Sequence, residues 1–237
     1  MRVAVAVALV PLAAFTAGCQ STQSKSAELE AQAGEVTQQK GLKIAKRSRD
    51  VKATHATLLS DRNGTAAVVE LKNTTKKTLV QVPVAIDVLD RGKKTFSNDA
   101  PGLDPALVGV SVLRPGESLA WVNDQVLVPG SKLEPTVGAT TKRPPKELPK
   151  IDVGPPKLGG DPTSGIAIEG TVANRSQILQ RKLVIYAVAR KDGRVVAAGR
   201  GQVERLKPGK SSSYQIFFIG NPEGATVELA APPTTFE

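Results

Sequence analysis

The chain has 237 residues, a formal net charge of +10, and 21 glycines and 17 prolines. Its single histidine and single cysteine argue against multi-histidine zinc sites and against Cys-His and Ser-His-Asp catalytic groups. Aromatic residues make up only 3% of the chain, so it lacks the stacking platforms of single-strand nucleic-acid binders, and nucleic acid is not an expected partner. The composition indicates aliphatic strands joined by many turns.

The amino terminus has the three-part plan of a secretory signal. Arg2 supplies a positive charge, Val3 to Phe15 form an apolar run, and small residues follow as far as Gly18. The run is well short of the roughly 20 residues that an α-helix needs to cross a bilayer. Residues 1–18 are therefore predicted to be a signal peptide and not a permanent membrane span.

A lipid anchor is predicted at Cys19. The segment Thr16-Ala17-Gly18-Cys19 resembles the lipobox of bacterial lipoproteins, although Thr16 stands where leucine is usual. The resemblance implies a diacylglyceryl group on Cys19 and a protein anchored to the cell membrane, facing outside the cytoplasm in a bacterial envelope. Cys19 is the only cysteine, so no internal disulfide can form. The alternative is an ordinary signal peptide cut near Gly18, with Cys19 left as a bystander.

Residues 19–50 are expected to form a flexible tether, because they are polar and show no sustained apolar period. Ala27 to Ala33 could form a short helix, which would be marginal in isolation. Basic residues cluster just before the first folded region, namely Lys40, Lys43, Lys46, Arg47, Arg49 and Lys52. They could face anionic lipid or wall polymer, or they could be a solvated linker that keeps the protein soluble.

Residues 51–139 are predicted to form a first β-sandwich domain. Asn63-Gly64 is a strong hairpin signal, because both residues accept a positive φ. It lies between predicted strands at Thr54–Ser60 and Thr65–Lys72. Polar residues in the turn, including Asp61, fit this reading.

A long strand is predicted over Leu79–Leu89, where apolar and polar residues alternate and one face should be buried. Its apolar positions are Val80, Val82, Val84, Ile86 and Val88. Pro83 cannot donate a ladder hydrogen bond, so it is expected at an edge or a bulge. A further strand is predicted over Ser118–Leu127, after a turn at Leu113–Gly116.

Two segments are expected to be irregular. Asn98–Gly109 contains two prolines and is predicted to be a long loop, our candidate for a distinctive binding surface. Residues 140–162 are rich in proline, which favours an extended, semi-rigid linker. The alternative, that Lys150–Gly154 is the first strand of the next domain, stays open.

Residues 163–237 are predicted to be a second β-sandwich domain that repeats the first. Asn174 and Gly193 stand 101 positions after Asn73 and Gly92. Later in the copies, the Leu-x-Pro-Gly turn beginning at Leu206 stands 93 positions after its counterpart. A constant offset with one step indicates a duplication with one inserted loop in the first copy.

These motifs resemble the FxLYD-domain family of bacterial surface lipoproteins. The resemblance rests on Gly170–Asn174, Tyr186–Gly193 and Leu206–Gly209 in the second copy and on Asp87–Gly92 in the first, which lacks the family's aromatic residue there. It covers about 68–126 and 166–229. It implies an all-β chain with two tandem immunoglobulin-like β-sandwich domains, and it implies no catalytic residues.

Few side chains suggest chemistry. His55 is expected to be an ordinary strand residue, and Asp87 and Asp90 lack the ligand density of a calcium loop. Val195–Gly201 has neither the lysine nor the helix of a phosphate-binding loop and is predicted to be a strand. Four aromatic residues, Trp121, Tyr214, Phe217 and Phe218, could form a ligand platform, but they are expected to fill the cores.

The sequence thus predicts a non-enzymatic, lipid-anchored envelope protein without a cofactor, which binds or scaffolds other envelope components. Its expected partners are the membrane, through a lipid on Cys19, and an envelope protein. The alternative is a binder of anionic wall polymer or lipid headgroups through the basic tether and linker. A hydrolytic enzyme would need a constellation of side chains that the sequence does not show.

Overall fold

The protein's architecture is given by a computed structural model that describes residues 41–161 and 165–236. Its regular elements are strands β1 to β15 and one short 3-10 helix, η1, and the strand pairings are antiparallel. The predicted all-β class is confirmed. None of the described residues belongs to a helix long and apolar enough to cross a membrane. The predictions for the signal peptide, for Cys19 and for the tether up to residue 40 lie outside the described residues.

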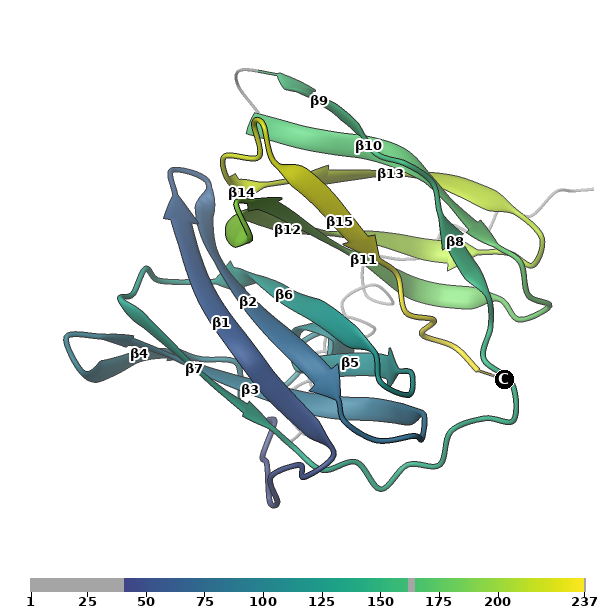
Figure 1. Ribbon diagram of the computed structural model, residues 1–237, viewed down its shortest axis with the longest axis horizontal. Coiled ribbons are helices and arrows are strands. Elements are labelled where there is room, and N and C mark those ends of the chain that lie inside the picture. Colours follow the sequence, from purple (N-terminus) through teal and green to yellow (C-terminus); the bar gives the residue numbers. More distant parts are fainter. Residues whose placement is uncertain (1–40, 162–164, 237) are drawn as a thin grey trace, which may run out of the picture. The chain divides into compact units, whose positions relative to one another are not determined.

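The first half of the fold contains two sheets (Figure 1). In one sheet β2 lies between β1 and β6, and in the other β3 pairs with β4, β5 and β7. The predicted hairpin is confirmed, because Asp61 pairs with Gly64 and the Asn63 amide donates to the Asp61 carboxylate at 2.7 Å. The elements are β1 (Val51–Asp61), β2 (Gly64–Asn73), β3 (Leu79–Asp90), β4 (Lys93–Ser97), η1 (Pro105–Leu107), β5 (Gly109–Leu113), β6 (Ser118–Val126) and β7 (Lys132–Val137).

The alternation predicted for β3 is confirmed. Its apolar positions, Val80, Val82, Val84, Ile86 and Val88, are at most 3% exposed. Pro83 lies where β3 changes its partner, since the residues up to Pro83 pair with β5 and those from Val84 onward pair with β7. The missing N–H of Pro83 therefore falls at the end of a ladder.

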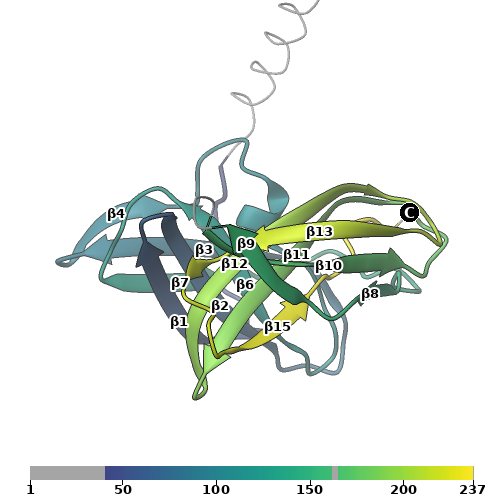
Figure 2. The same ribbon diagram turned by 90° about the horizontal axis from the view of Figure 1, so that it is seen from above.

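The second half has the same plan (Figure 2). One sheet places β10 between β13 and the short strands β8 and β9, and the other has the order β14-β12-β11-β15. The elements are β8 (Ile151–Val153), β9 (Lys157–Asp161), β10 (Gly165–Asn174), β11 (Gln180–Lys191), β12 (Arg194–Leu206), β13 (Ser211–Phe217), β14 (Ile219–Gly220) and β15 (Thr226–Ala230).

Corresponding strands share their bounds at the offsets read from the sequence. β10 and β11 begin and end 101 positions after β2 and β3, and β12 ends 93 positions after β5. In the second half β12 runs unbroken beside β11, whereas in the first half the segment between Ser97 and Gly109 separates β4 from β5. The inserted residues thus interrupt one strand and produce the loop that carries η1.

Two predicted flexible segments are partly structured. β8 and β9 pair with β10 inside the range predicted as linker, so Ile151–Val153 is the first strand of the second half, as the alternative reading had it. In the predicted tether, Arg47 bridges to Gly138 and the Lys46 carbonyl accepts a hydrogen bond from the Ala139 amide at 2.9 Å. The backbone before β1 thus adds to the sheet edge beyond β7.

Three of the four aromatic residues fill the cores as predicted, since Trp121 is 0%, Phe218 2% and Tyr214 6% exposed. The prediction for Phe217 is wrong, because its side chain is 43% exposed. It stands between the buried Ile216 and Phe218 on a strand, so alternation turns it outward. Val195–Gly201 lies within β12, as predicted. A carbon added at Gly199 would lie 2.1 Å from the Phe217 carbonyl oxygen, which explains why a glycine is needed there.

Candidate functional site

The outer face of β11 joins the second half to the first. Leu183, Ile185 and Ala187 belong to the core of the second half. Their neighbours Val184, Tyr186 and Val188 belong instead to one cluster with the core residues of the first half. Because β11 is buried on both faces, the two halves share a continuous apolar contact.

Ion pairs between the halves border this contact. Arg190 Nη1 lies 2.8 Å from Glu70 Oε1, and Arg190 Nε lies 3.0 Å from Glu228 Oε2. Burial lowers the pKa of Arg190, but the hydrogen bonds to Glu228 and Glu70 outweigh it and raise the pKa above its usual value. The guanidinium therefore stays charged and links β2 to β11 and β15.

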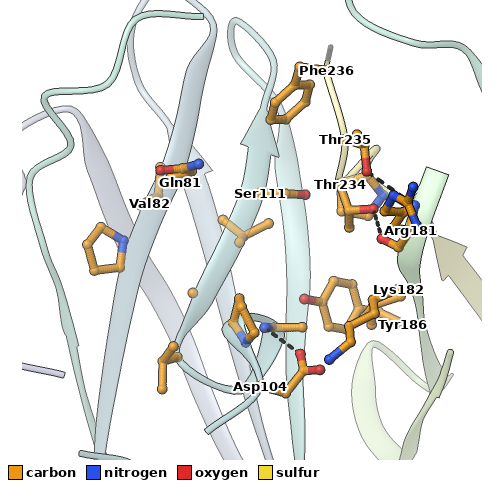
Figure 3. A pocket seen from close by; sticks show the side chains of 18 of the residues that line it. Gln81, Val82, Asp104, Ser111, Arg181, Lys182, Tyr186, Thr234, Thr235 and Phe236 are labelled. Atoms are coloured by element: carbon orange, nitrogen blue, oxygen red, sulfur yellow. Dashed lines mark hydrogen bonds between the residues drawn. The ribbon is translucent and has the colours of Figure 1, made fainter. Parts of the chain in front are cut away.

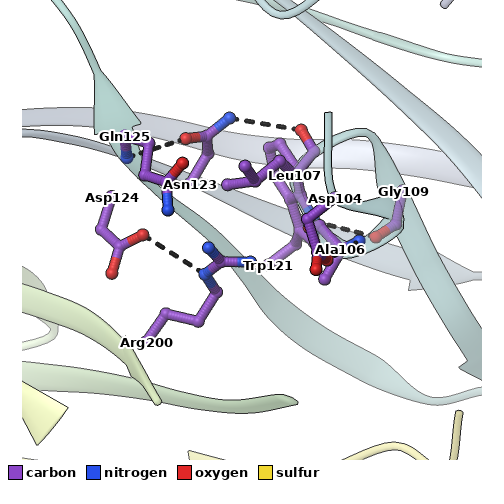
Figure 4. A network of polar contacts seen from close by, with 9 residues as sticks. All are labelled: Asp104, Ala106, Leu107, Gly109, Trp121, Asn123, Asp124, Gln125 and Arg200. Carbon is purple, nitrogen blue, oxygen red and sulfur yellow. Dashed lines mark hydrogen bonds and ion pairs between the residues drawn. The ribbon is translucent and has the colours of Figure 1, made fainter. Parts of the chain in front are cut away.

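A second arginine lies deeper in the interface (Figure 4). Arg200 Nε lies 3.3 Å from Asp124 Oδ1, and the Arg200 side chain is only 8% exposed. Its Nη1 is buried and has no hydrogen-bond partner among the described residues. Asp124 thus balances the charge of the guanidinium but leaves one of its buried nitrogens without an acceptor among the described residues.

A half-open cleft of about 620 Å³ lies beside this contact (Figure 3). Its apolar lining comes from both halves and includes Val82 and Val110 on one side and Val184 and Tyr186 on the other. Its volume falls in the range of roughly 300–1,000 Å³ that is usual for small-molecule sites, and such sites are mostly apolar with a few polar groups. The cleft is therefore our candidate functional site.

The carboxyl-terminal segment forms one wall of the cleft. Gln180 is fully buried, and its Oε1 accepts hydrogen bonds from the amides of Thr234 at 2.9 Å and Thr235 at 3.2 Å. Thr234 Oγ1 also donates to the Arg181 carbonyl at 2.7 Å. These bonds hold the segment after β15 against the start of β11.

The inserted loop forms the opposite wall, and its ends are fixed to the core. Asn98 is fully buried and donates to the carbonyls of Val84 at 2.9 Å and Leu107 at 2.7 Å. Trp121 Nε1 donates to the Ala106 carbonyl at 2.8 Å, and Asp104 Oδ1 caps η1 by accepting from the Ala106 amide. A fixed loop gives the cleft a preformed shape.

The polar groups of the cleft are few. Arg181 and Lys182 line it together with Asp104, the one carboxylate that the described residues contribute. Figure 3 shows Lys182 directed toward Asp104. Burial raises the pKa of Tyr186 well above its usual value despite the nearby positive charge of Arg200, so the phenol stays protonated at neutral pH. The site can therefore offer a hydroxyl donor and positive charge around an apolar floor.

Gln81 and Lys182 both line the cleft and both have a positive φ, of 49° and 47°. Such values are uncommon for residues other than glycine. The two residues occupy equivalent positions of β3 and β11. The strained strand position is therefore a feature of the repeated fold, and each half contributes one such residue to the cleft.

The side chains singled out from the sequence do not gather into one site. His55 is a strand residue on β1, with Nδ1 3.5 Å from Glu70 Oε2. Asp87 pairs with Lys94 at 2.8 Å and Asp90 with Arg91 at 3.1 Å. Within 41–161 and 165–236, no three histidine, cysteine or acidic residues are grouped so that they could hold a metal ion. Cys19 lies outside the described residues.

Sequence reasoning found one wall of the cleft and missed the other. The predicted loop Asn98–Gly109 supplies Asp104, Ala106 and Gly109 to the lining. Gln180 and the carboxyl-terminal segment were not singled out, although Gln180 stands where the first copy has Leu79. The signal in the sequence was therefore the polar Gln180 at a position where the other copy has an apolar residue.

Comparison of the sequence with protein-family models and with curated proteins found no match. The resemblance to FxLYD domains stays a prediction.

Proposed function

We propose that this chain is a non-enzymatic protein of the bacterial cell envelope, held at the membrane by a lipid on Cys19, and that it binds another envelope component in the cleft. The observation that carries the proposal is the preformed cleft, which both halves and the carboxyl-terminal segment build. The described residues of its lining include one carboxylate and no histidine or cysteine, which suits binding better than acid–base or nucleophilic catalysis. The anchor would keep such a binding site at the membrane surface.

Site-specific photo-crosslinking in cells tests the binding site. A photoreactive residue replaces Ser111, which lines the cleft, or Glu204, which is exposed at the equivalent position of β12. We expect a discrete adduct in the envelope fraction from position 111 and none from position 204. Equal adducts from both positions, or none from position 111, would contradict the proposal.

Mass spectrometry tests the anchor. The full chain extracted from membranes should begin at a lipidated Cys19, and a Cys19→Ala variant should leave the membrane fraction. An unmodified, soluble wild-type chain would remove the membrane part of the proposal while leaving the cleft to be judged by crosslinking.

A second candidate function is binding of anionic wall polymer or lipid headgroups by basic residues. It is favoured by the exposure of Lys43, Lys46, Arg47 and Arg49. The Lys46 carbonyl accepts a hydrogen bond from the Ala139 amide, so this basic segment lies beside the residues that follow β7. Those residues include Lys142 and Arg143, which are exposed as well. Basic side chains from two segments would thus face solvent near one sheet edge.

Salt dependence separates the two functions, because binding through exposed charges weakens as salt is added. At physiological ionic strength such interactions are largely screened beyond a distance of about 8 Å. Replacing Lys43, Lys46, Arg47 and Arg49 together by glutamine should abolish binding to anionic vesicles if the second function holds. The same replacements should leave crosslinking at position 111 unchanged.

A further inference from the structure

We infer that the cleft binds a single-chain amphiphile with an aliphatic body and an anionic head group. The inference rests on the proposed function, because it names the ligand class of the same cleft.

The aliphatic body is indicated by the shape and lining of the cleft. Val82, Pro83, Val108, Val110 and Val184 contribute apolar surface from both halves. Val82, Val110 and Val184 are themselves at most 2% exposed, so the floor is set by packed side chains of β3, β5 and β11. An apolar chain that replaces water on this surface gains the hydrophobic contribution of burial.

The sign of the head group is indicated by the charges around that floor. Among the described residues, two cationic residues and one carboxylate line the cleft, so this part of the lining carries a net positive charge. Figure 3 shows Lys182 directed toward the side of the cleft where Asp104 stands. Arg181 and Lys182 would attract an anion that enters the cleft and repel a cation.

Tyr186 in the cleft lining, with Arg200 behind it, strengthens the preference for an anion. The Tyr186 hydroxyl stays protonated, and it makes no hydrogen bond to another described residue. Arg200 pairs with Tyr186 across β11 and β12, and its buried Nη1 has no partner within the described part of the chain. A protonated hydroxyl donor thus lines the cleft, and behind it Arg200, which does not line the cleft, has one buried nitrogen without a described acceptor.

Calorimetric titration of the full chain with three probes tests the inference. The probes are decanoate, decanol and decyltrimethylammonium, which share an aliphatic chain and differ in charge. The protein carries Cys19→Ala, so that no attached acyl chain competes with the probe. We expect one equivalent of decanoate to bind, with decanol weaker by about tenfold, the factor that a charge-assisted hydrogen bond supplies, and the ammonium probe weakest.

Two conservative variants should move the affinity for decanoate in opposite directions. Lys182→Gln removes a positive charge and should lower the affinity for decanoate by about tenfold, while changing the affinity for decanol little. Asp104→Asn removes a negative charge, so it should raise the affinity for decanoate and leave the affinity for decanol unchanged. The asparagine keeps an oxygen that can cap η1. Arg143→Gln, which removes an exposed charge that does not line the cleft, is the matched control and should have no effect.

A bulky variant locates the binding. Ser111→Trp should fill the cleft and abolish binding of all three probes, whereas Glu204→Trp at the equivalent exposed position should not. The inference is overturned if no probe binds, if the ammonium probe binds as well as decanoate, or if Ser111→Trp binds decanoate normally. Failure of all probes together with a specific crosslink at position 111 would leave the proposed function standing with a different ligand class.

Discussion

Asn73 and Asn174, 101 positions apart, share a set of equivalent hydrogen bonds in the two halves. Each side chain is fully buried. The Asn73 amide donates to the Leu113 carbonyl at 3.2 Å, and the Asn174 amide donates to the Leu206 carbonyl at 3.1 Å. In both cases Oδ1 accepts from the backbone amide two residues later. The asparagine therefore ties the end of one strand to the end of the strand that leads into the Leu-x-Pro-Gly turn.

Asn73→Ala and Asn174→Ala should each lower the free energy of unfolding by about 2–3 kcal/mol, because buried carbonyls lose their donor. Asn221→Ala is the matched control, since Asn221 is exposed and caps only the Glu223 amide. Urea denaturation of the three variants measures the difference. A loss below 1 kcal/mol in either buried variant would show that these bonds are replaceable.

The same two variants report on the contact between the halves. Val184, Tyr186 and Val188 share one apolar cluster with the core of the first half. Both substitutions should therefore shift a single cooperative transition. A separate, earlier transition in one variant would mean that the shared cluster does not couple the halves.

A glycine at position 81 should stabilise the fold. Gln81, the third residue of β3, has a φ of 49°, a conformation that costs residues with a Cβ roughly 1–2 kcal/mol. Gln81→Gly should raise the free energy of unfolding by about 0.5–1 kcal/mol after the larger entropy loss of glycine. Ala85→Gly, at an ordinary position of the same strand, should lower it by a similar amount. If both variants are destabilised equally, Gln81 is not strained in solution.

The fold was predictable from the sequence where burial is one-sided. Alternation in β3 and the Asn63-Gly64 turn directly fix a strand register and a hairpin. The contact between the halves was harder to predict, because the run from Leu183 to Ala189 in β11 is apolar at every position. Such a run indicates a strand buried on both faces but does not say what covers the second face.

The cleft was predictable only in part. Its loop wall follows from the inserted prolines, which mark Asn98–Gly109 as irregular. Its other wall depends on Gln180 holding the backbone of Thr234 and Thr235, a contact across more than fifty residues of chain. No local pattern encodes such a pairing. Its one mark in the sequence is that Gln180 replaces the leucine found at the equivalent position, Leu79, of the first copy.

Removing Arg200 and Asp124 together should destabilise the fold less than removing Asp124 alone. Asp124→Ala leaves the buried guanidinium without its ion-pair partner and should lower the free energy of unfolding by about 3 kcal/mol. Adding Arg200→Met removes the orphaned charge and should recover most of that loss. Thermal or urea unfolding of the single and double variants completes the cycle. A double variant as unstable as Asp124→Ala would mean that Arg200 contributes chiefly by packing.

Tyr186 should make stability fall at high pH. Burial raises its pKa in the folded protein above the ordinary tyrosine value near 10. Above that value the unfolded chain loses the phenolic proton while the folded chain keeps it, so the folded state binds more protons and stability decreases as the pH rises. The contribution is fully present below pH 10 and is lost progressively toward the folded pKa. The free energy of unfolding is measured for the wild type and for Tyr186→Phe at pH 8 and pH 11. Between these pH values the wild type should lose stability relative to the variant. A pH-independent difference would mean that the hydroxyl reaches water through the cleft and titrates normally.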